Sequence, residues 1–481
     1  MVNLNNQVVN ATKWSSLTEL AAKLVAPIST MVLARLLTPD AFGVLVTATM
    51  VISFAEIFTD AGFQKYLIQH KFNSDEDLYR STNVAFWSNL VLSLVIWVVI
   101  ICFSEKIATL VGNDGWGAVI AVSCFCLPLA AFSRVQMAFY KRSFDFNTLF
   151  WVRIVGLLLP LLVTIPLAYF TRSYWSLIAG VIVLNLSHAI ILTDKSNWKP
   201  NLFYSFRLLK DMFSFTAWSM VEAVAIWMTG YVDIFIVGTM LNQHYLGVYR
   251  TSMSTVGQIM GLITAATTPV LFSSLSRLQD NDEELKRMFF SFQKLVGILV
   301  IPLGVGIYLF RDLITEILLG NQWTEAAHFI GLWGLTSSIT IVFAHYCSEM
   351  FRAKGKPRLS VLAQVLHMAF LIPTVLWAVD KGFDTLCEAR ALVRLTGVVI
   401  NTTILYFLVK ISFVDMIKHL LPATIASLAM LVATLGILIC SEQLYWQILC
   451  VVIAIFVYVL IIMLSPKERH IIFNLKKYIN R

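Results

Sequence analysis

The chain has 481 residues, of which 58% are hydrophobic and only 13% are charged. Soluble globular proteins contain about 45–50% apolar and about 25% charged residues, so the composition excludes a soluble domain and predicts a polytopic membrane protein. The formal net charge of +8 comes from lysines and arginines between apolar runs. We interpret it as a signal of membrane topology and expect no nucleic-acid partner.

Runs of about 20 apolar residues, the length that crosses a bilayer as a helix, indicate about fourteen transmembrane helices. They begin near residues 12, 41, 81, 116, 148, 173, 212, 245, 289, 326, 358, 385, 415 and 443. The preceding segment "MVNLNNQVVN" is polar and lacks the basic start and the cleavage site of a signal peptide. We therefore expect the first helix to be retained.

Lysines and arginines concentrate in alternate connections, which the positive-inside rule assigns to the cytoplasm. These connections include "FRAKGKPRL" and the tail "PKERHIIFNLKKYINR", and we also assign Arg134, Lys141 and Arg142 to one of them. The opposite connections contain Arg35, Lys106, Arg172, Arg311 and Lys381. With an even number of spans, both termini are predicted to be cytoplasmic.

The two halves of the chain share an internal repeat. A shift of 204 residues aligns "KWSSLTELAAKLVAPISTMVLARLLTPDAFGVLVTA" with "AWSMVEAVAIWMTGYVDIFIVGTMLNQHYLGVYRTS" without a gap. Trp14 then falls on Trp218, and Gly43 falls on Gly247. Because an even number of spans separates the copies, both have the same orientation, so this is a parallel repeat about an axis along the membrane normal.

The predicted fold class is all-α, with two parallel six-helix lobes around a central cavity and two extra C-terminal helices. We expect helices 1–6 in residues 1–205, helices 7–12 in residues 206–411, and the extra helices with the basic tail in residues 412–481. Paired lobes that open a cavity alternately to either side of the membrane are typical of transporters.

The first span contains unexpected polar and helix-breaking residues. Glu19 and Lys23 are four residues apart, and Pro27 follows one turn later. A charge at the bilayer centre costs about 2.5–3.5 kcal/mol, so these charges either form an ion pair or face a polar cavity. Pro27 removes a backbone hydrogen bond and is our candidate for a hinge.

Several cations lie within predicted spans and are candidates for binding an anionic substrate. Arg390 and Arg394 are four residues apart on one helix face, where they repel each other unless an anion, a carboxylate or water lies nearby. Arg153 and Arg250 lie near span ends, where either snorkelling or cavity lining explains them. With Lys23, these four arginines are the predicted substrate-binding residues.

The acidic residues within predicted spans are Glu19, Glu56, Glu222 and Asp233. They are candidates for coupling transport to protons or sodium ions, and ion pairing with the cations is the alternative. The seven cysteines lie in or at the ends of spans and show no metal-ligand spacing. We therefore predict neither a metal site nor a cofactor.

Five segments spread over most of the chain resemble the Wzx-type oligosaccharide flippases, the polysaccharide transporter branch of the multidrug/oligosaccharidyl-lipid/polysaccharide exporter superfamily. They are "ATKWSSLTEL", "TMVLARLLTPDAFGVLVTATMVISFAEIFTDAGFQKYLIQ", "YKRSFDFNTL", "ILLGNQWTEAA" and "FRAKGKPRLSV". The resemblance implies a multi-pass carrier that moves undecaprenyl-diphosphate-linked repeat units across the bacterial inner membrane. The product is O-antigen, capsule or exopolysaccharide, and the implied partners are membrane lipid and a polysaccharide polymerase. The resemblance assigns no role residue by residue.

Two other functions stay open from the sequence. A cation-coupled drug exporter of the same superfamily has the same fold, although the matching connections favour the flippase. A membrane enzyme of the polysaccharide pathway usually needs a sizeable outer loop, whereas the longest outward connection here lies near residues 310–325. We therefore expect a transporter and no catalytic residues.

Overall fold

The computed structural model describes residues 2–60, 62–196, 198–438, 440–441 and 443–464, and their side chains except at 2–12, 16, 20, 214–219, 221 and 222. Within these residues the chain is helical and forms no strand. Fourteen helices in this part are long and apolar enough to cross a membrane. The predicted all-α, multi-pass class is confirmed, and the basic tail lies outside the described residues.

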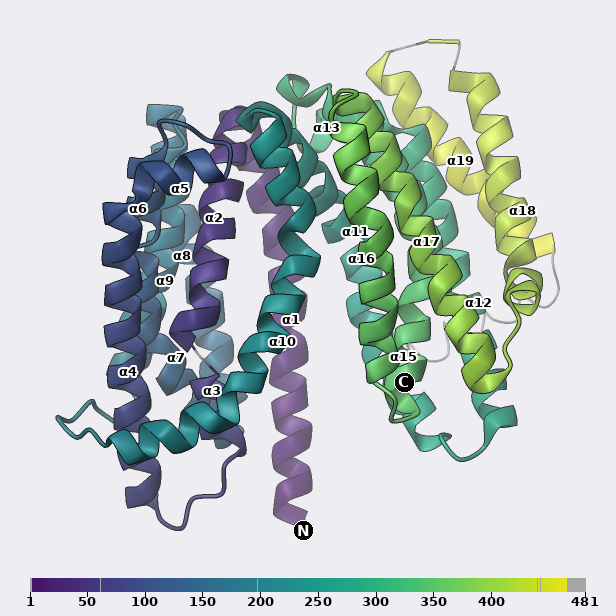
Figure 1. Cartoon of the computed structure of the whole chain (residues 1–481). Coiled ribbons are helices and arrows are strands. Elements are labelled where there is room, and N and C mark those ends of the chain that lie inside the picture. Colours follow the sequence, from purple (N-terminus) through teal and green to yellow (C-terminus); the bar gives the residue numbers. More distant parts are fainter. Residues whose placement is uncertain (1, 61, 197, 439, 442, 465–481) are drawn as a thin grey trace. The chain divides into compact units, whose positions relative to one another are not determined.

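The chain forms two compact units, Met1–Arg250 and Thr251–Arg481. In the first unit (Figure 1) the helices are α1 (Val2–Leu36), α2 (Pro39–Asp60), α3 (Phe63–Gln69), α4 (Asp75–Cys102), α5 (Ser104–Leu110), α6 (Gly117–Ser123), α7 (Cys126–Arg142), α8 (Phe146–Thr171), α9 (Trp175–Lys195), α10 (Phe206–Met240) and the start of α11 (Gln243–Arg277).

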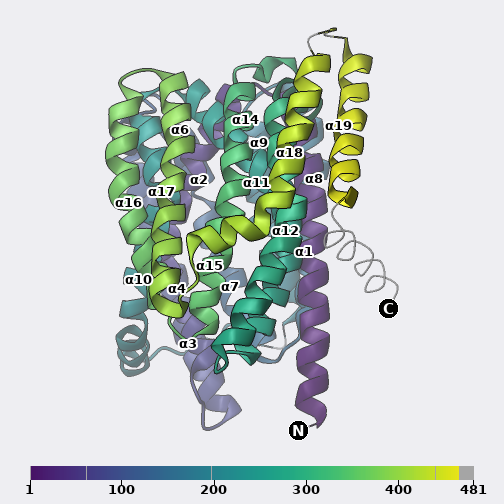
Figure 2. The same ribbon diagram turned by 90° about the vertical axis from the view of Figure 1, so that its right-hand side faces the viewer.

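The second unit contains the rest of α11 and the helices that follow it. These are α12 (Asp282–Leu309), α13 (Arg311–Leu318), the 3-10 turn η1 (Asn321–Trp323), α14 (Ala326–Thr340), the π-helical turn η2 (Ile341–His345), α15 (Tyr346–Ala353), α16 (Arg358–Val379), α17 (Phe383–Val409), α18 (Phe413–Leu438) and α19 (Leu444–Leu464). Figure 2 shows α18 and α19 side by side, and both pack against α12.

Local sequence explains where two of the long helices begin. The side chain of Ser74 accepts a hydrogen bond from the backbone N–H of Asp77 at the start of α4. Asn281 caps α12 in the same way. Each cap is followed by three acidic residues in the first turn, which the positive end of the helix dipole stabilises. These polar starts set the boundary between connection and apolar span.

The N-terminal turns of α2 and α11 cross in very close contact, through residues that the repeat relates. A Cβ atom on Gly43 would lie 1.9 Å from the carbonyl oxygen of Gln243, and one on Gly247 would lie 1.9 Å from that of Pro39. Both pairs of equivalent residues are 204 positions apart. The contacts are therefore exchanged between the two copies, as a parallel two-fold repeat requires, and only glycine permits this approach.

The predicted division into residues 1–205, 206–411 and 412–481 stays a prediction. Contacts divide the chain later, after Arg250, because α10 packs against α2, α3 and α4. A division by contacts follows local packing and does not test one that rests on sequence repetition. The predicted central cavity and the cytoplasmic location of the termini also stay predictions.

Apolar side chains cover much of the outer surface of the helices. On α19, for example, Phe456 and Leu464 are exposed, whereas Tyr458 is buried and donates a hydrogen bond to the carbonyl of Ile298 at 2.7 Å. Exposed apolar surface of this extent suits contact with hydrocarbon. The few polar side chains within the spans therefore indicate where a functional site lies.

Candidate functional site

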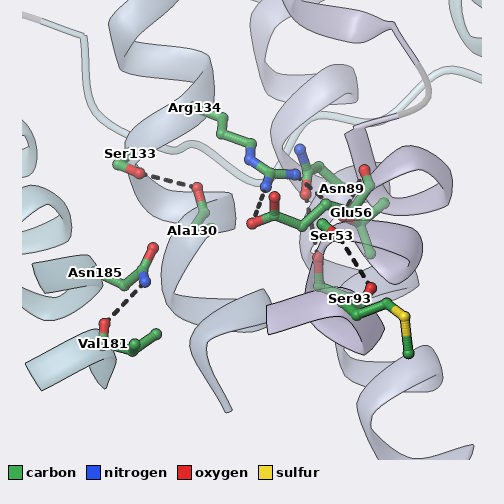
Figure 3. A network of polar contacts seen from close by, with 11 residues as sticks. Ser53, Glu56, Asn89, Ser93, Ala130, Ser133, Arg134, Val181 and Asn185 are labelled. Carbon is green, nitrogen blue, oxygen red and sulfur yellow. Dashed lines mark hydrogen bonds and ion pairs between the residues drawn. The ribbon is translucent and has the colours of Figure 1, made fainter. Parts of the chain in front are cut away.

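A charge pair lies between α2 and α7 in the first unit. The guanidinium of Arg134 forms an ion pair with Glu56 and donates a hydrogen bond from Nη1 to Oγ1 of Thr59 at 3.2 Å. The exposed side-chain fractions are 17% for Arg134 and 35% for Glu56. Figure 3 shows the two side chains meeting beside Asn89 of α4.

This pair corrects one part of the sequence analysis. We assigned Arg134 to a cytoplasmic connection, but the residue lies inside α7, which continues to Arg142. Polar residues at the end of the apolar run hid the continuation of the helix. For Glu56, the structure has the ion pair that the sequence left as an alternative to proton or sodium coupling.

A row of aromatic rings runs along the faces of α2 and α10, and we call it the aromatic row. Centroids are 5.3 Å apart for Phe58 and Phe54, 4.8 Å for Phe54 and Trp227, and 5.4 Å for Trp227 and Tyr231. Arg250 lies at its end, with Cζ 5.9 Å from the Tyr231 ring. Phe54 and Phe58 are exposed, so the row forms a surface with a cation at one end.

The aromatic row is joined to the neighbourhood of the charge pair by a hydrogen bond. Nε1 of Trp227 donates to Oγ of Ser53 at 3.0 Å, and Ser53 lies one helical turn before Glu56. The bond fixes the orientation of the indole against α2, since a partly buried Trp N–H needs an acceptor. Ring faces and charges therefore occupy neighbouring parts of one surface.

The second unit contains a separate cationic cluster between α14 and α17. Cζ of Arg394 lies 3.8 Å from the centroid of the Trp333 ring, and Cζ of Arg390 lies 4.9 Å from it. Nη1 of Arg394 donates a hydrogen bond to Oγ of Ser337 at 2.7 Å. We call Trp333, Ser337, Arg390 and Arg394 the arginine–tryptophan cluster.

The structure brings the two predicted arginines together and shows how their charges are accommodated. The electron-rich face of an indole attracts guanidinium groups, which offsets part of the repulsion between Arg390 and Arg394. Arg390 is buried and Arg394 is half-buried. Trp333 and Ser337 were not predicted from the sequence because no motif links α14 to α17, although a tryptophan in a span was a usable signal.

The candidate residues Glu19 and Lys23, which lie in the described part of α1, do not form the ion pair that their spacing suggested. Glu19 is exposed and Lys23 is half-buried. The structure has no ion pair between these two described residues, so self-neutralisation does not explain them. α1 continues as a helix through Pro27, and a hinge there stays a prediction. Arg153, on the neighbouring helix α8, is exposed.

The remaining acidic candidates are Glu222 and Asp233 of α10. Asp233 is buried and accepts a hydrogen bond from the hydroxyl of Tyr249 at 3.0 Å. The side chain of Glu222 lies outside the described residues. The described part of the chain contains no group of three or more His, Cys, Asp or Glu residues that could hold a metal ion.

The π-helical turn η2 places a histidine against α11 in the second unit. Nε2 of His345 lies 3.1 Å from Oγ1 of Thr268, and the hydroxyl of Tyr346 lies 2.7 Å from Oγ1 of Thr267. The carbonyl of Val342 within the turn accepts a hydrogen bond from Nε2 of Gln293 at 3.3 Å. Single π turns in long helices frequently occur at functional sites.

Comparison with known proteins places this geometry in context. Residues 32–328, more than half of the chain, match the model of a family described as polysaccharide biosynthesis protein. A membrane protein in the cps region of Klebsiella pneumoniae is 23% identical over 97% of both chains. The lipopolysaccharide biosynthesis protein WzxC of Escherichia coli K12 is 20% identical over 78% of this chain and 75% of its own.

Among solved structures, the lipid II flippase MurJ in an inward closed conformation superposes with a TM-score of 0.74. The match covers 96% of this chain and 100% of that chain at 13% identity. At this identity the structural likeness establishes only the fold, whereas the match to the family model establishes family membership. The chain belongs to the polysaccharide biosynthesis protein family.

Proposed function

We propose that the chain is a flippase that translocates undecaprenyl-diphosphate-linked oligosaccharide repeat units across the bacterial inner membrane for polysaccharide biosynthesis. The observation that carries the proposal is the arginine–tryptophan cluster, in which two cations contact one tryptophan ring within membrane helices. Its support from relatives is the family match, a relative named for lipopolysaccharide biosynthesis, and the fold of a lipid II flippase.

The chemistry of such a substrate matches these groups. A diphosphate in hydrocarbon loses its hydration, so its passage requires cations and hydrogen-bond donors in place of water. Arg394 and Arg390 supply guanidinium groups, and Arg250 supplies another at the end of the aromatic row. Sugar rings carry C–H groups on their faces, which pack on exposed aromatic rings such as Phe54. The polyprenyl chain stays in lipid.

Several finer parts belong to the same proposal. Lys23 and Arg153 of the first unit are further candidates for contacting the diphosphate during its passage, and Pro27 is the point at which α1 bends. Glu19, Glu222 and Asp233 are the remaining candidates for proton or sodium coupling, since Glu56 is already paired with Arg134. Alternating access moves the substrate, and a polysaccharide polymerase receives it on the outer side.

The test locates lipid-linked intermediates in cells with and without the protein. The accessibility of the sugars to an impermeant enzyme assigns the intermediates to a leaflet of the intact membrane. Mass spectrometry of the extracted lipids then gives their masses. The proposal predicts that complete repeat units accumulate on the cytoplasmic face only when the protein is absent. Units that reach the outer face without the protein, or an unchanged lipid pool, would contradict it.

A further inference from the structure

A cavity of about 470 Å³ opens at one end of the first unit. Its lining comes from the start of α4, the end of α7, the start of α8, and the end of α9 with the residues after it. The lining residues are Tyr79, Phe139, Tyr140, Ser143, Asp145, Thr148, Lys195, Ser196 and Trp198. The lysine and arginine distribution predicts that these helix ends face the cytoplasm.

Aromatic rings form one part of this cavity. The Tyr79 and Phe139 ring centroids are 6.1 Å apart, and the Phe139 and Trp198 rings are stacked at 6.1 Å with 23° between their planes. Phe139 and Trp198 are held by the surrounding core, in which Trp198 also packs against Phe86. Tyr79, by contrast, is 43% exposed. The cavity therefore offers rigid ring faces and an accessible tyrosine.

Polar side chains form the other part of the lining. Some of them are already hydrogen-bonded within the protein, whereas others are accessible to a ligand. Asp145 caps α8, because its carboxylate accepts hydrogen bonds from the N–H of Thr148 at 3.1 Å and from its hydroxyl at 2.7 Å. Ser143 donates to the carbonyl of Phe139 at 2.9 Å. The side chain of Lys195 is exposed and makes no hydrogen bond or ion pair within the described part of the chain.

Neighbouring cations at the same end of the unit donate hydrogen bonds to the protein itself. Lys141 donates to Oε1 of Gln64 at 3.2 Å, and Arg142 donates to the carbonyls of Leu67 and His70, each at 2.8 Å. Lys195 is therefore an accessible donor among cations that already bind the protein's own acceptors. A cavity with aromatic ring faces, hydroxyls and an accessible ammonium is chemically suited to a sugar. The sugar ring has C–H groups that pack on aromatic faces and oxygen atoms that accept hydrogen bonds.

We propose that this cavity binds a sugar of the lipid-linked oligosaccharide at the cytoplasmic end of the first unit, through residues other than those proposed to contact the diphosphate. The inference rests on the proposed function for the identity of the oligosaccharide. Tyr79 and Tyr140 pack against the sugar ring, and Lys195 donates to one of its oxygens. The site thus recognises the glycan rather than the lipid or the diphosphate.

The test measures binding of the lipid-free glycan to the purified full-length protein. The probe is the reducing oligosaccharide released by mild acid from the lipid-linked repeat unit of the producing strain, and titration calorimetry gives its Kd. Tyr79→Ala and Lys195→Gln should each weaken binding about tenfold or more, which corresponds to about 1.4 kcal/mol. Tyr79→Phe, which keeps the ring, should bind like the wild type.

Two control variants match these changes outside the cavity. Tyr169→Ala removes an exposed tyrosine from the other end of α8, and Lys210→Gln removes an exposed lysine from α10. Both should leave the Kd unchanged. Undecaprenyl diphosphate without sugar should not compete with the glycan for this site.

The outcomes separate this inference from the proposed function. A wild-type protein that changes the leaflet of lipid-linked units but does not bind the glycan would overturn the cavity assignment alone. Equal affinity of the Tyr79→Ala, Lys195→Gln and control variants would overturn it as well. Selective loss in the two cavity variants supports a sugar site, and it does so even where the leaflet assay contradicts flippase activity.

Discussion

The charge pair between α2 and α7 leads to a sharp prediction about stability. Arg134→Met removes the cation but keeps much of the side-chain volume, so the Glu56 carboxylate is left among membrane helices without its partner. The variant also loses the 3.2 Å hydrogen bond to Thr59. We expect the uncompensated carboxylate, rather than lost packing, to dominate the effect.

The magnitude follows from the exposure of the two side chains. Breaking a fully buried ion pair by removing one partner costs about 3–5 kcal/mol. Glu56 is 35% exposed and Arg134 is 17% exposed, so water compensates part of this cost and we expect about 1–3 kcal/mol. At about 2–4 °C per kcal/mol for a unit of this size, the melting temperature should fall by several degrees.

The assay is thermal unfolding of the purified protein in detergent, followed by tryptophan fluorescence. The double variant Glu56→Gln/Arg134→Met removes both charges and should recover most of the loss, because no charge is left uncompensated. Arg80→Met is the matched control, since its ion pair with Glu76 is exposed on both sides and contributes about 0–1 kcal/mol. Equal stability of Arg134→Met and Arg80→Met would refute the reasoning.

Four further predictions concern packing and transport. Gly247→Ala should lower the melting temperature by several degrees, because its Cβ would overlap a backbone carbonyl of α2, whereas Gly257→Ala meets no atom within 4 Å and serves as the control. Arg394→Ala should abolish transport in the leaflet assay while the protein remains in the membrane; normal transport would remove this residue from the proposed site. Trp333→Leu should reduce transport less than Arg394→Ala, because it leaves both guanidinium groups in place. Arg250→Ala should reduce transport about tenfold or more, and an unchanged rate would favour snorkelling.

The sequence alone determined the class of this protein and much of its architecture. Composition and the length of the apolar runs predicted about fourteen spans, and the structure has fourteen candidate helices in its described part. These features follow from transfer of apolar surface into lipid, which depends on local sequence and needs no knowledge of neighbours. The repeat was visible for a related reason, since Gly43 and Gly247 occupy equivalent crossings where only glycine fits.

The pairing of polar residues was decided by the tertiary structure. Arg390 and Arg394 were recognised from their spacing, but their partner Trp333 is on another helix. Arg134 was assigned to a connection, and its partner Glu56 lies 78 positions earlier in the sequence. In a membrane helix the lipid-facing and protein-facing sides are both apolar, so periodicity does not reveal which way a side chain points. Only the packing of neighbouring helices sets that rotation, and with it the groups that meet.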